Sequence, residues 1–145
     1  MEDKKVLTEL HVAVSTYKMP EQARQLISSG QLLLLCGVTA AGKNTISTYL
    51  VDRANYGQVV SHTTRKPREN HGSLEQSGKE YWFVSPSEML ELVRQGAFIE
   101  VKAIHGDTCY GTSIKSVESV INANKHPVME IDVQGALELT QAVPN

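Results

Sequence analysis

The stretch from Cys36 to Thr45, CGVTAAGKNT, carries residue types that can bind phosphate. Gly37, four further residues and then Gly42-Lys43 match the spacing of the G-x-x-x-x-G-K-[ST] loop. Backbone N–H groups in such a loop cradle anionic oxygens, the start of the next helix adds partial positive charge, and the lysine reaches the β- and γ-phosphates. We therefore predict a nucleotide phosphate site formed by Gly37, Thr39, Ala40, Ala41, Gly42, Lys43, Asn44 and Thr45.

The residue after the lysine departs from this pattern, because Asn44 stands where a hydroxyl normally binds magnesium. An amide oxygen is also a ligand for a hard cation, although its geometry differs. Thr45 follows directly, but the helix turns it in another direction. The alternative without function is a plain glycine turn before a helix. The strand expected before the loop and the helix expected after it favour a phosphate site.

A second cluster lies in the stretch SHTTRKPR, residues 61–68. Arg65 and Arg68 are three residues apart, so two guanidinium forks could clamp one phosphate. The hydroxyls of Ser61, Thr63 and Thr64 would complete the shell. A solvated basic loop is the alternative.

The overall composition places limits on partners. The chain has 145 residues, is 41% hydrophobic and carries a formal net charge of −2, so no global basic field favours nucleic acid or a membrane surface. Two cysteines without C-x-x-C spacing favour a reducing, cytoplasmic setting, and five scattered histidines predict no structural metal site. The N-terminus lacks the layout of a signal peptide, and no apolar run is long enough to span a bilayer.

Alternating strands and helices must position these residues, which predicts an α/β protein. We expect strands in QLLLLCG, around Val59-Val60, and in KEYWFVS, AFIEVKAI and PVMEIDVQG. We expect helices over Lys43–Ala54, in SPSEMLELVRQG and in SIKSVESVINANK, and a turn-rich connection in HGDTCYGT. The second helix is well marked, with Ser85 as N-cap, Glu88 completing a capping box and Gly96 at its end. We predict a helical extension over residues 1–30, a core over 31–60 and 112–145, and a β-rich insertion over 61–111.

Further motifs follow the two phosphate clusters in the order GKEYWFVS, GAFIE, YGTS and EIDVQGA. With these motifs the sequence resembles guanylate kinase from about Gln31 to Ala136. The resemblance implies a P-loop NTPase fold, a parallel sheet flanked by helices with a small GMP-binding insertion. It also implies transfer of the γ-phosphate of ATP to GMP in purine nucleotide metabolism, with Mg²⁺ as cofactor.

The resemblance further implies roles for individual residues. Ser61, Arg65, Arg68, Tyr81 and Tyr110 would hold the phosphate of GMP, and Glu100 and Thr112 would read guanine. The complete implied GMP set is Ser61, Arg65, Arg68, Glu75, Tyr81, Glu100, Tyr110, Thr112, Glu130 and Asp132. The implied catalytic set is Lys43, Arg65, Arg68 and Asp132, and the implied magnesium ligands are Asn44 and Asp132. A carboxylate can accept the N1–H and exocyclic amine of guanine, so such a site should reject AMP.

The chain departs from the family pattern in several places besides Asn44. The segment after Arg68, RENHGSLEQSG, is longer than usual, and both Glu69 and Glu75 could be the glutamate that the family often has there. HGDTCYGT is one residue longer, and Tyr110 is a better match than Cys109 because Gly111-Thr112 follows it. Glu130 replaces a common aspartate.

The family pattern also continues beyond Asn145 with core strands, an arginine-bearing lid and a C-terminal helix. We therefore expect this stretch alone to be a weak or inactive kinase, and either an oligomeric partner or a missing C-terminal segment to complete the sheet. Two alternatives stay open. One is a guanylate-kinase-like module that binds phosphate or phosphopeptides, which the retained Gly37, Gly42 and Lys43 disfavour. The other, a P-loop kinase for a different acceptor, explains the residues of the insertion poorly.

Overall fold

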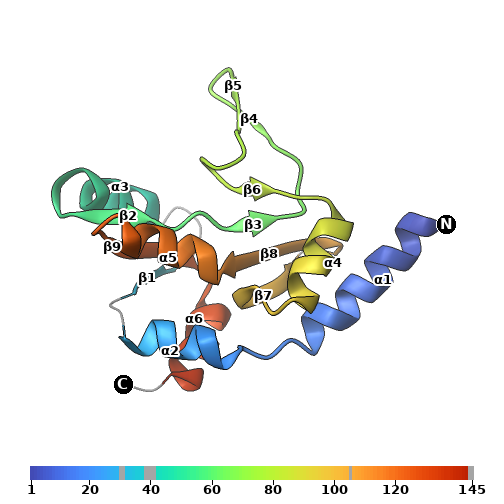
Figure 1. Ribbon diagram of the computed structural model, residues 1–145. Helices are drawn as coiled ribbons and strands as arrows, with labels where there is room; N and C mark the ends of the chain where they lie inside the picture. Colours follow the sequence, from blue (N-terminus) through green and yellow to red (C-terminus); the bar gives the residue numbers. More distant parts are fainter. Residues whose placement is uncertain (30–31, 38–41, 105, 144–145) are drawn as a thin grey trace. The chain divides into compact units, whose positions relative to one another are not determined.

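The computed structural model describes residues 1–29, 32–37, 42–104 and 106–143. The chain forms two compact units, each with its own buried residues. Figure 1 labels the helices and strands of the chain. We name the units by their sheets. The mixed-sheet unit comprises Met1–Pro20 and Val60–Ser113, and the parallel-sheet unit comprises Glu21–Val59 and Ile114–Asn145.

The parallel-sheet unit combines three parallel strands with four helices among the described residues. Its elements are α2 (Glu21–Ser29), β1 (Leu33–Cys36), α3 (Lys43–Arg53), β2 (Tyr56–Gln58), α5 (Ile114–Asn122), β9 (His126–Ile131) and α6 (Val133–Ala142). Strand β9 lies between β1 and β2 and runs parallel to both. This arrangement confirms the predicted α/β class with a parallel sheet and helices.

The central position of β9 follows from its sequence. Val128 and Met129 are buried, as expected for an apolar strand covered on both faces. The register pairs Leu35 with Glu130 and Cys36 with Ile131, so β1 and β9 end at the same edge of the sheet. The phosphate loop that follows β1 and the acidic residues at the end of β9 therefore belong to one edge.

The described residues of the mixed-sheet unit form a four-stranded sheet, a short hairpin and two helices. Its elements are α1 (Glu2–Ser15), β3 (His62–Thr63), β4 (Glu69–Asn70), β5 (Ser73–Leu74), β6 (Trp82–Phe83), α4 (Pro86–Arg94), β7 (Phe98–Ile104) and β8 (Thr108–Ser113). The strand order is β6-β3-β8-β7, with β3 and β6 parallel and the other pairs antiparallel. Strands β4 and β5 pair only with each other.

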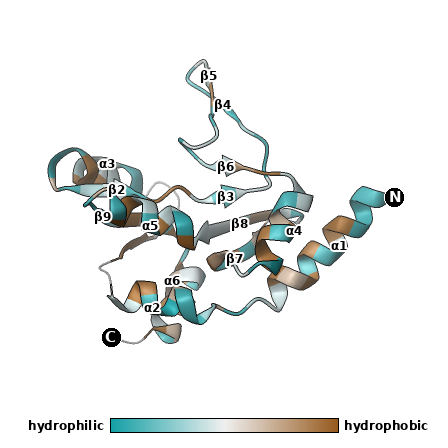
Figure 2. Cartoon of the chain, in the orientation of Figure 1, coloured by the Kyte–Doolittle hydropathy of each residue, from teal (hydrophilic) through white to brown (hydrophobic). Residues whose placement is uncertain are grey.

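The core of this unit lies between the sheet and the helices α1 and α4. Leu10 of α1, Met89 of α4 and Phe98 of β7 are fully buried and belong to one hydrophobic cluster. Both helices alternate apolar and polar residues along their length (Figure 2). The segment Met1–Pro20, predicted to form one extension with residues 21–30, thus packs with the strands of the mixed-sheet unit.

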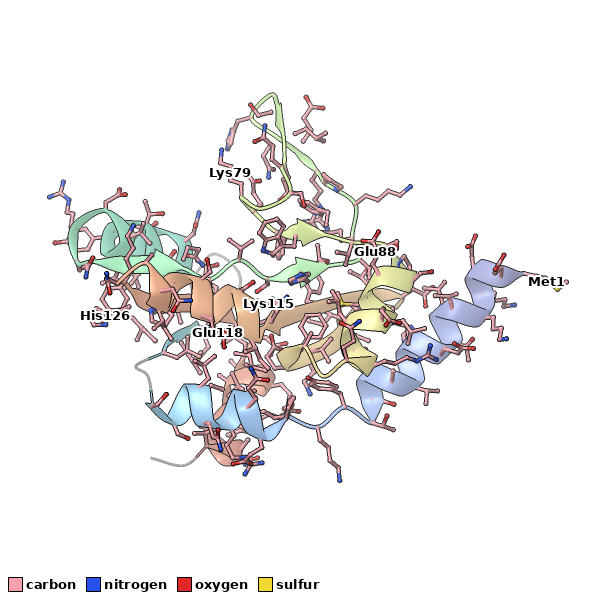
Figure 3. The ribbon with its side chains drawn as sticks, in the orientation of Figure 1. Met1, Lys79, Glu88, Lys115, Glu118 and His126 are labelled. Atoms are coloured by element: carbon pink, nitrogen blue, oxygen red, sulfur yellow. The ribbon has the colours of Figure 1, made fainter. Side chains whose placement is uncertain are left out.

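Helix α4 begins as predicted. The Ser85 Oγ accepts the Glu88 N–H at 3.1 Å, and the Glu88 Oε2 accepts the Ser85 N–H at 3.4 Å, which confirms the capping box. Glu88 is labelled in the first turn of α4 in Figure 3. Gly96 follows the helix with a φ of +68°, a conformation that favours glycine.

Two expectations about local structure are wrong. The predicted turn-rich connection HGDTCYGT is largely strand β8, because its residues pair with β7 on one side and β3 on the other. The strand expected around Val59-Val60 lies earlier, at Tyr56–Gln58, although the Val59 N–H still donates to the Val128 carbonyl at 2.9 Å. Long-range pairing overrode the local turn residues in β8.

None of the described helices combines the length and apolar character that crossing a membrane requires.

Candidate functional site

The phosphate loop ends where α3 begins. Gly42 is the N-cap of this helix and has a φ of +88°, which a side chain would strain. The Lys43 Nζ turns back and donates to the Gly37 carbonyl at 2.9 Å, so the lysine reaches across the loop. Thr39, Ala40 and Ala41, which the sequence also predicts in this site, lie outside the described residues.

The first turn of α3 presents Asn44 and Thr45 at the surface. Ser47, one turn after Lys43, is instead 2% exposed. Its Oγ lies 3.1 Å from the Glu130 Oε1 and 3.1 Å from the Asn44 carbonyl, so it can donate to either. This link between α3 and β9 is not among the contacts predicted from the sequence. Its only signal is a hydroxyl residue four positions after the lysine, on the same helix face.

The end of β9 supplies two carboxylates to the same edge of the sheet. Asp132 is the N-cap of α6, and its Oδ1 accepts the Gly135 N–H at 2.6 Å. Carboxylate and amide oxygens are the ligand type that Mg²⁺ prefers, and this ion often takes only one or two carboxylates besides substrate phosphates. Among the described residues no group of three or more His, Cys, Asp or Glu gathers into a metal site. The carboxylate of Asp132 and the amide oxygen of Asn44 are of the ligand type that Mg²⁺ takes.

In the mixed-sheet unit, strand β8 separates two kinds of side chain by simple alternation. Cys109 is fully buried in the hydrophobic cluster, and burial raises the pKa of its thiol to about 11. Tyr110 points the other way, and its ring lies 5.7 Å from the ring of Tyr81. Of the two candidates in the sequence, only Tyr110 thus lies beside other predicted site residues.

Arg65 and Glu75 form a largely buried ion pair at the centre of this set. The Arg65 Nη1 lies 2.8 Å from Glu75 Oε1 and Nη2 lies 3.3 Å from Oε2, a two-pronged contact. The hydrogen bond from Arg65 lowers the pKa of the Glu75 carboxyl, and the same bond raises the pKa of Arg65. Glu69 lies exposed in β4, so of the two glutamates it is Glu75 that contacts Arg65. The Glu75 carboxylate accepts two hydrogen bonds from Arg65 and thereby restricts the position of its guanidinium.

Aromatic rings surround the same guanidinium. The Arg65 Cζ lies 5.3 Å from the centre of the Tyr81 ring and 5.8 Å from that of Phe83. Such contacts restrict the orientation of the guanidinium plane. Burial raises the pKa of the Tyr81 hydroxyl above its ordinary value.

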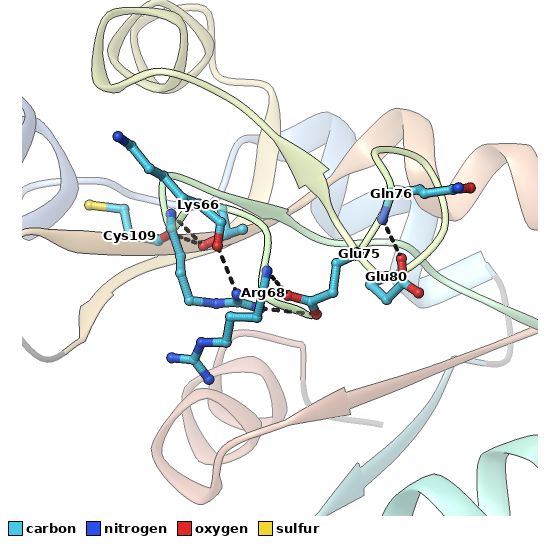
Figure 4. Close-up of polar contacts among 8 residues, drawn as sticks. Lys66, Arg68, Glu75, Gln76, Glu80 and Cys109 are labelled. Carbon is cyan, nitrogen blue, oxygen red and sulfur yellow. Dashed lines mark hydrogen bonds and ion pairs between the residues drawn. The ribbon is translucent and has the colours of Figure 1, made fainter. Parts of the chain in front are cut away.

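Arg68 joins the cluster through its backbone. Its N–H donates to Glu75 Oε1 at 2.7 Å, and its carbonyl accepts the Glu75 N–H at 2.8 Å. The Arg68 side chain is exposed, and its guanidinium points away from the Glu75 carboxylate (Figure 4). The two arginines predicted as a pair thus differ, since Arg65 is held in place and Arg68 reaches into solvent.

A chain of hydrogen bonds links three other predicted residues. The Ser61 Oγ lies 3.2 Å from the Thr112 Oγ1, and the Thr112 Oγ1 donates to the Glu100 Oε1 at 2.9 Å. Thr112 is fully buried and lies opposite Glu100 in the register of β7 and β8. This arrangement fixes the orientation of a carboxylate on the same sheet face as Tyr110.

The hydroxyls of Thr63 and Thr64 do not have the predicted place in a phosphate shell. The Thr63 Oγ1 donates to the Cys109 carbonyl at 3.1 Å, and the Thr64 Oγ1 accepts the Cys109 N–H at 2.9 Å. These side chains join β3 to β8, beside the Thr64 N–H, which donates to the same Cys109 carbonyl at 3.1 Å. They hold the backbone that carries Arg65.

The predicted site residues divide between the two units. The mixed-sheet unit brings together Ser61, Arg65, Arg68, Glu75, Tyr81, Glu100, Tyr110 and Thr112, and the parallel-sheet unit holds Gly37, Gly42, Lys43, Asn44, Thr45, Glu130 and Asp132. Glu130 and Asp132, predicted with the GMP set, therefore lie in the unit of the phosphate loop.

Known proteins similar to this chain point to one family. The sequence model of the family described as guanylate kinase matches residues 29–145. Guanylate kinase from Thermotoga maritima is 42% identical over 117 residues, which cover 80% of this chain and 54% of that protein. Guanylate kinase from Bifidobacterium longum is 40% identical over 116 residues, covering 78% and 56%. The crystal structure of guanylate kinase from Anaplasma phagocytophilum matches with a TM-score of 0.56 and 29% identity, covering 77% and 53%. The chain thus spans about half the length of these relatives.

Proposed function

The chain belongs to the guanylate kinase family, and we propose that the protein transfers the γ-phosphate of ATP to GMP, giving ADP and GDP. One observation carries this proposal. A single unit combines a guanidinium anchored by a buried carboxylate with a second carboxylate oriented by hydroxyls. The first suits a phosphate and the second suits guanine, so together they suit a guanine nucleotide.

In this proposal Arg65 binds the phosphate of GMP. The bond to Glu75 holds the guanidinium before any ligand arrives, so less side-chain entropy is lost on binding. Tyr81 and Tyr110 add hydroxyl donors, and the exposed Arg68 side chain is available to fold onto the phosphate. Arg65 and Arg68 supply positive charge where the transferred group develops negative charge.

Guanine recognition is assigned to Glu100 and Thr112. A carboxylate can accept both the N1–H and the exocyclic amine of guanine, whereas adenine offers an acceptor at N1. The bond from Thr112 keeps the Glu100 carboxylate in one orientation. AMP would leave this carboxylate without donors and should be a poor substrate for that reason.

ATP is assigned to the phosphate loop of the parallel-sheet unit. Lys43 would exchange its bond to the Gly37 carbonyl for bonds to the β- and γ-phosphates, and the start of α3 adds partial positive charge. Asp132 and Asn44 would hold Mg²⁺, which neutralises phosphate charge when bound. A phosphate oxygen of GMP then attacks the γ-phosphorus, and the bond from that phosphorus to the β-phosphate breaks.

A coupled assay of ATP consumption by the purified protein tests this proposal with GMP, dGMP, AMP, CMP and UMP as acceptors. We expect turnover with GMP to exceed turnover with AMP by roughly 10⁴-fold, since a site built for a hydrogen-bonding base rejects analogues strongly. Folded protein that shows no GMP-dependent turnover would contradict the assignment as a kinase.

Replacing Glu100 separates a kinase from a binding module. Glu100→Gln should reduce use of GMP while the KM for ATP stays unchanged, because ATP is assigned to the other unit. Calorimetry measures the binding of GMP to the wild-type protein separately from turnover. GMP binding without any ATP turnover would favour the module that only binds phosphate compounds.

A further inference from the structure

The first residues of the chain pack against the strand that carries Glu100. Helix α1 buries Leu10 completely and Val14 largely, in the same cluster as Phe98 of β7. Two polar contacts join the helix to other parts of the unit. Glu9 pairs with Arg94 of α4 at 3.0 Å, and His11 lies 3.1 Å from Asp107 in the turn between β7 and β8.

Tyr17, just after this helix, binds the backbone of β7 at a single residue. Its hydroxyl oxygen accepts the Phe98 N–H at 3.0 Å and its O–H donates to the Phe98 carbonyl. Strand β7 lies at the edge of its sheet, where outward backbone groups have no neighbouring strand. One phenol thus satisfies both backbone groups of Phe98, a task normally performed by strand pairing.

The position of this contact matters because the strand is irregular there. The register of β7 and β8 shifts between Phe98 and Glu100, so the backbone before Glu100 departs from regular pairing. A one-residue irregularity re-aims the side chains that follow it. The Tyr17 hydroxyl fixes the residue on the near side of the shift, and the Thr112 hydroxyl holds the Glu100 carboxylate on the far side.

We propose that Tyr17 is a positioning residue for guanine recognition, which acts by fixing the irregular start of β7 and thereby the direction of Glu100. This inference rests on the proposed function. The segment Met1–Pro20 lies outside residues 29–145, the part of the chain that matches the family model. Burial raises the pKa of the Tyr17 hydroxyl above its ordinary value.

The test compares wild-type protein with Tyr17→Phe, which removes the hydroxyl and keeps the ring. KM values are measured for GMP, for ATP and for inosine monophosphate, which lacks the exocyclic amine. We expect the KM for GMP to rise roughly three- to tenfold, the effect of one hydrogen bond. The preference for GMP over inosine monophosphate should fall, and the KM for ATP should stay unchanged.

Glu9→Gln is the matched control, because it weakens an exposed contact of the same helix without touching β7. We expect it to leave both the KM for GMP and the base preference at wild-type values. Equal effects of Glu9→Gln and Tyr17→Phe would overturn the proposal, since attachment of the helix would then be the cause. A wild-type KM and base preference in Tyr17→Phe would also overturn it.

The wild-type arm distinguishes failure of this inference from failure of the proposed function. Wild-type protein that uses GMP, with an unaffected Tyr17→Phe variant, rejects only the positioning role. Wild-type protein without GMP turnover or binding rejects the proposed function and this inference with it.

If Tyr17→Phe does not fold, hydrogen exchange at single amides of the wild-type protein supplies the test. We expect the Phe98 amide to exchange slowly and to slow further with GMP, in parallel with the Glu100 amide. Exchange at Phe98 as fast as in an exposed loop would overturn the proposal. An exchange rate at the Phe98 amide that does not change with GMP, while the rate at the Glu100 amide does, would overturn it as well.

Discussion

Among single residues, the Arg65–Glu75 pair best illustrates how a buried contact prepares a surface for a ligand. Glu75 is 8% exposed and the Arg65 side chain is 13% exposed, so both charges have lost most of their water. Two N–H···O contacts and the Arg68 backbone N–H compensate this loss. A further contact, from the Arg65 Nη1 to the Lys66 carbonyl at 2.9 Å, also holds the guanidinium in place.

Replacing Glu75 should therefore weaken GMP binding without any direct contact to it. For Glu75→Gln we expect the KM for GMP to rise about tenfold, because Arg65 loses its anchor and adopts other rotamers. We expect unfolding to become easier by roughly 2–3 kcal/mol, since a charge is left with a poorer partner. Steady-state kinetics and urea unfolding measure the two effects. Glu69→Gln, an exposed neighbour, is the control and should leave both values unchanged.

The same pair predicts a dependence of stability on pH. The pKa of Glu75 is lowered from its ordinary value of 4.5, so the folded state binds this proton less readily than the unfolded chain. The stabilisation is complete above about pH 4.5 and is lost as the pH falls through the lower folded value. The difference in unfolding free energy between wild type and Glu75→Gln should shrink below pH 4.5. A difference that stays constant down to pH 2.5 would argue against this pair as the source.

Asn44 raises a separate question about magnesium. It lies exposed in the first turn of α3, where the loop pattern has a hydroxyl. We expect Asn44→Ser to lower the Mg²⁺ concentration for half-maximal activity several-fold, because the shorter hydroxyl restores the usual ligand geometry. Magnesium titrations of activity with Asn44→Ala as a control would measure this. Identical titrations for wild type and Asn44→Ser would identify the asparagine as a harmless variation.

Among the elements, helix α4 connects local sequence to the core of the mixed-sheet unit. Its capping box fixes where the helix starts, and the start decides that Met89, Leu90 and Val93 face the cluster with Phe98. Helix and strand therefore depend on each other, since a shifted helix would leave these side chains exposed. Through this packing the cap also supports β7, the strand that carries Glu100.

Removing the cap should have a measurable cost. We expect Ser85→Ala to reduce the free energy of unfolding by about 1 kcal/mol, because the Glu88 N–H loses its acceptor, the Ser85 Oγ. Ser87→Ala, two positions later in the same helix, is the control and should change stability by less than about 0.5 kcal/mol. Chemical unfolding followed by circular dichroism compares the two. Equal effects would mean that the cap contributes nothing particular.

At the scale of the whole molecule, the chain carries two units with separate buried residues and separate sets of predicted ligands. The mixed-sheet unit holds the residues proposed for GMP, and the parallel-sheet unit holds those proposed for ATP. Binding stabilises the part of a protein that makes the contacts, so each nucleotide should act first on its own unit.

Hydrogen exchange read by mass spectrometry can test this division. GMP should slow exchange in peptides from Val60–Ser113, and ATP with Mg²⁺ should slow it in peptides around β1 and α3. At a ligand concentration of about 100 times Kd, the stabilisation should approach 2.7 kcal/mol. GMP protection confined to β1 and α3 would contradict the assignment of the acceptor to the mixed-sheet unit.

The sequence alone determined features that depend on neighbouring residues. The spacing of Gly37, Gly42 and Lys43 predicted a loop between a strand and a helix, and the structure has β1 and α3 there. The capping box of α4 was also readable, since it needs only residues three apart. Such patterns depend on contacts between residues a few positions apart, so the local sequence is enough to predict them.

Only the tertiary structure decided between residues whose local patterns are equivalent. Glu69 and Glu75 both fit the sequence, and Glu75 alone lies where its carboxylate meets Arg65. Thr63 and Thr64 seemed suited to a phosphate, but strand pairing directs them to Cys109. Tyr17 gave no signal at all, because its partner Phe98 is 81 residues away. These contacts depend on which strands pair and which backbone groups remain unsatisfied at an edge, and that is a property of the folded sheet.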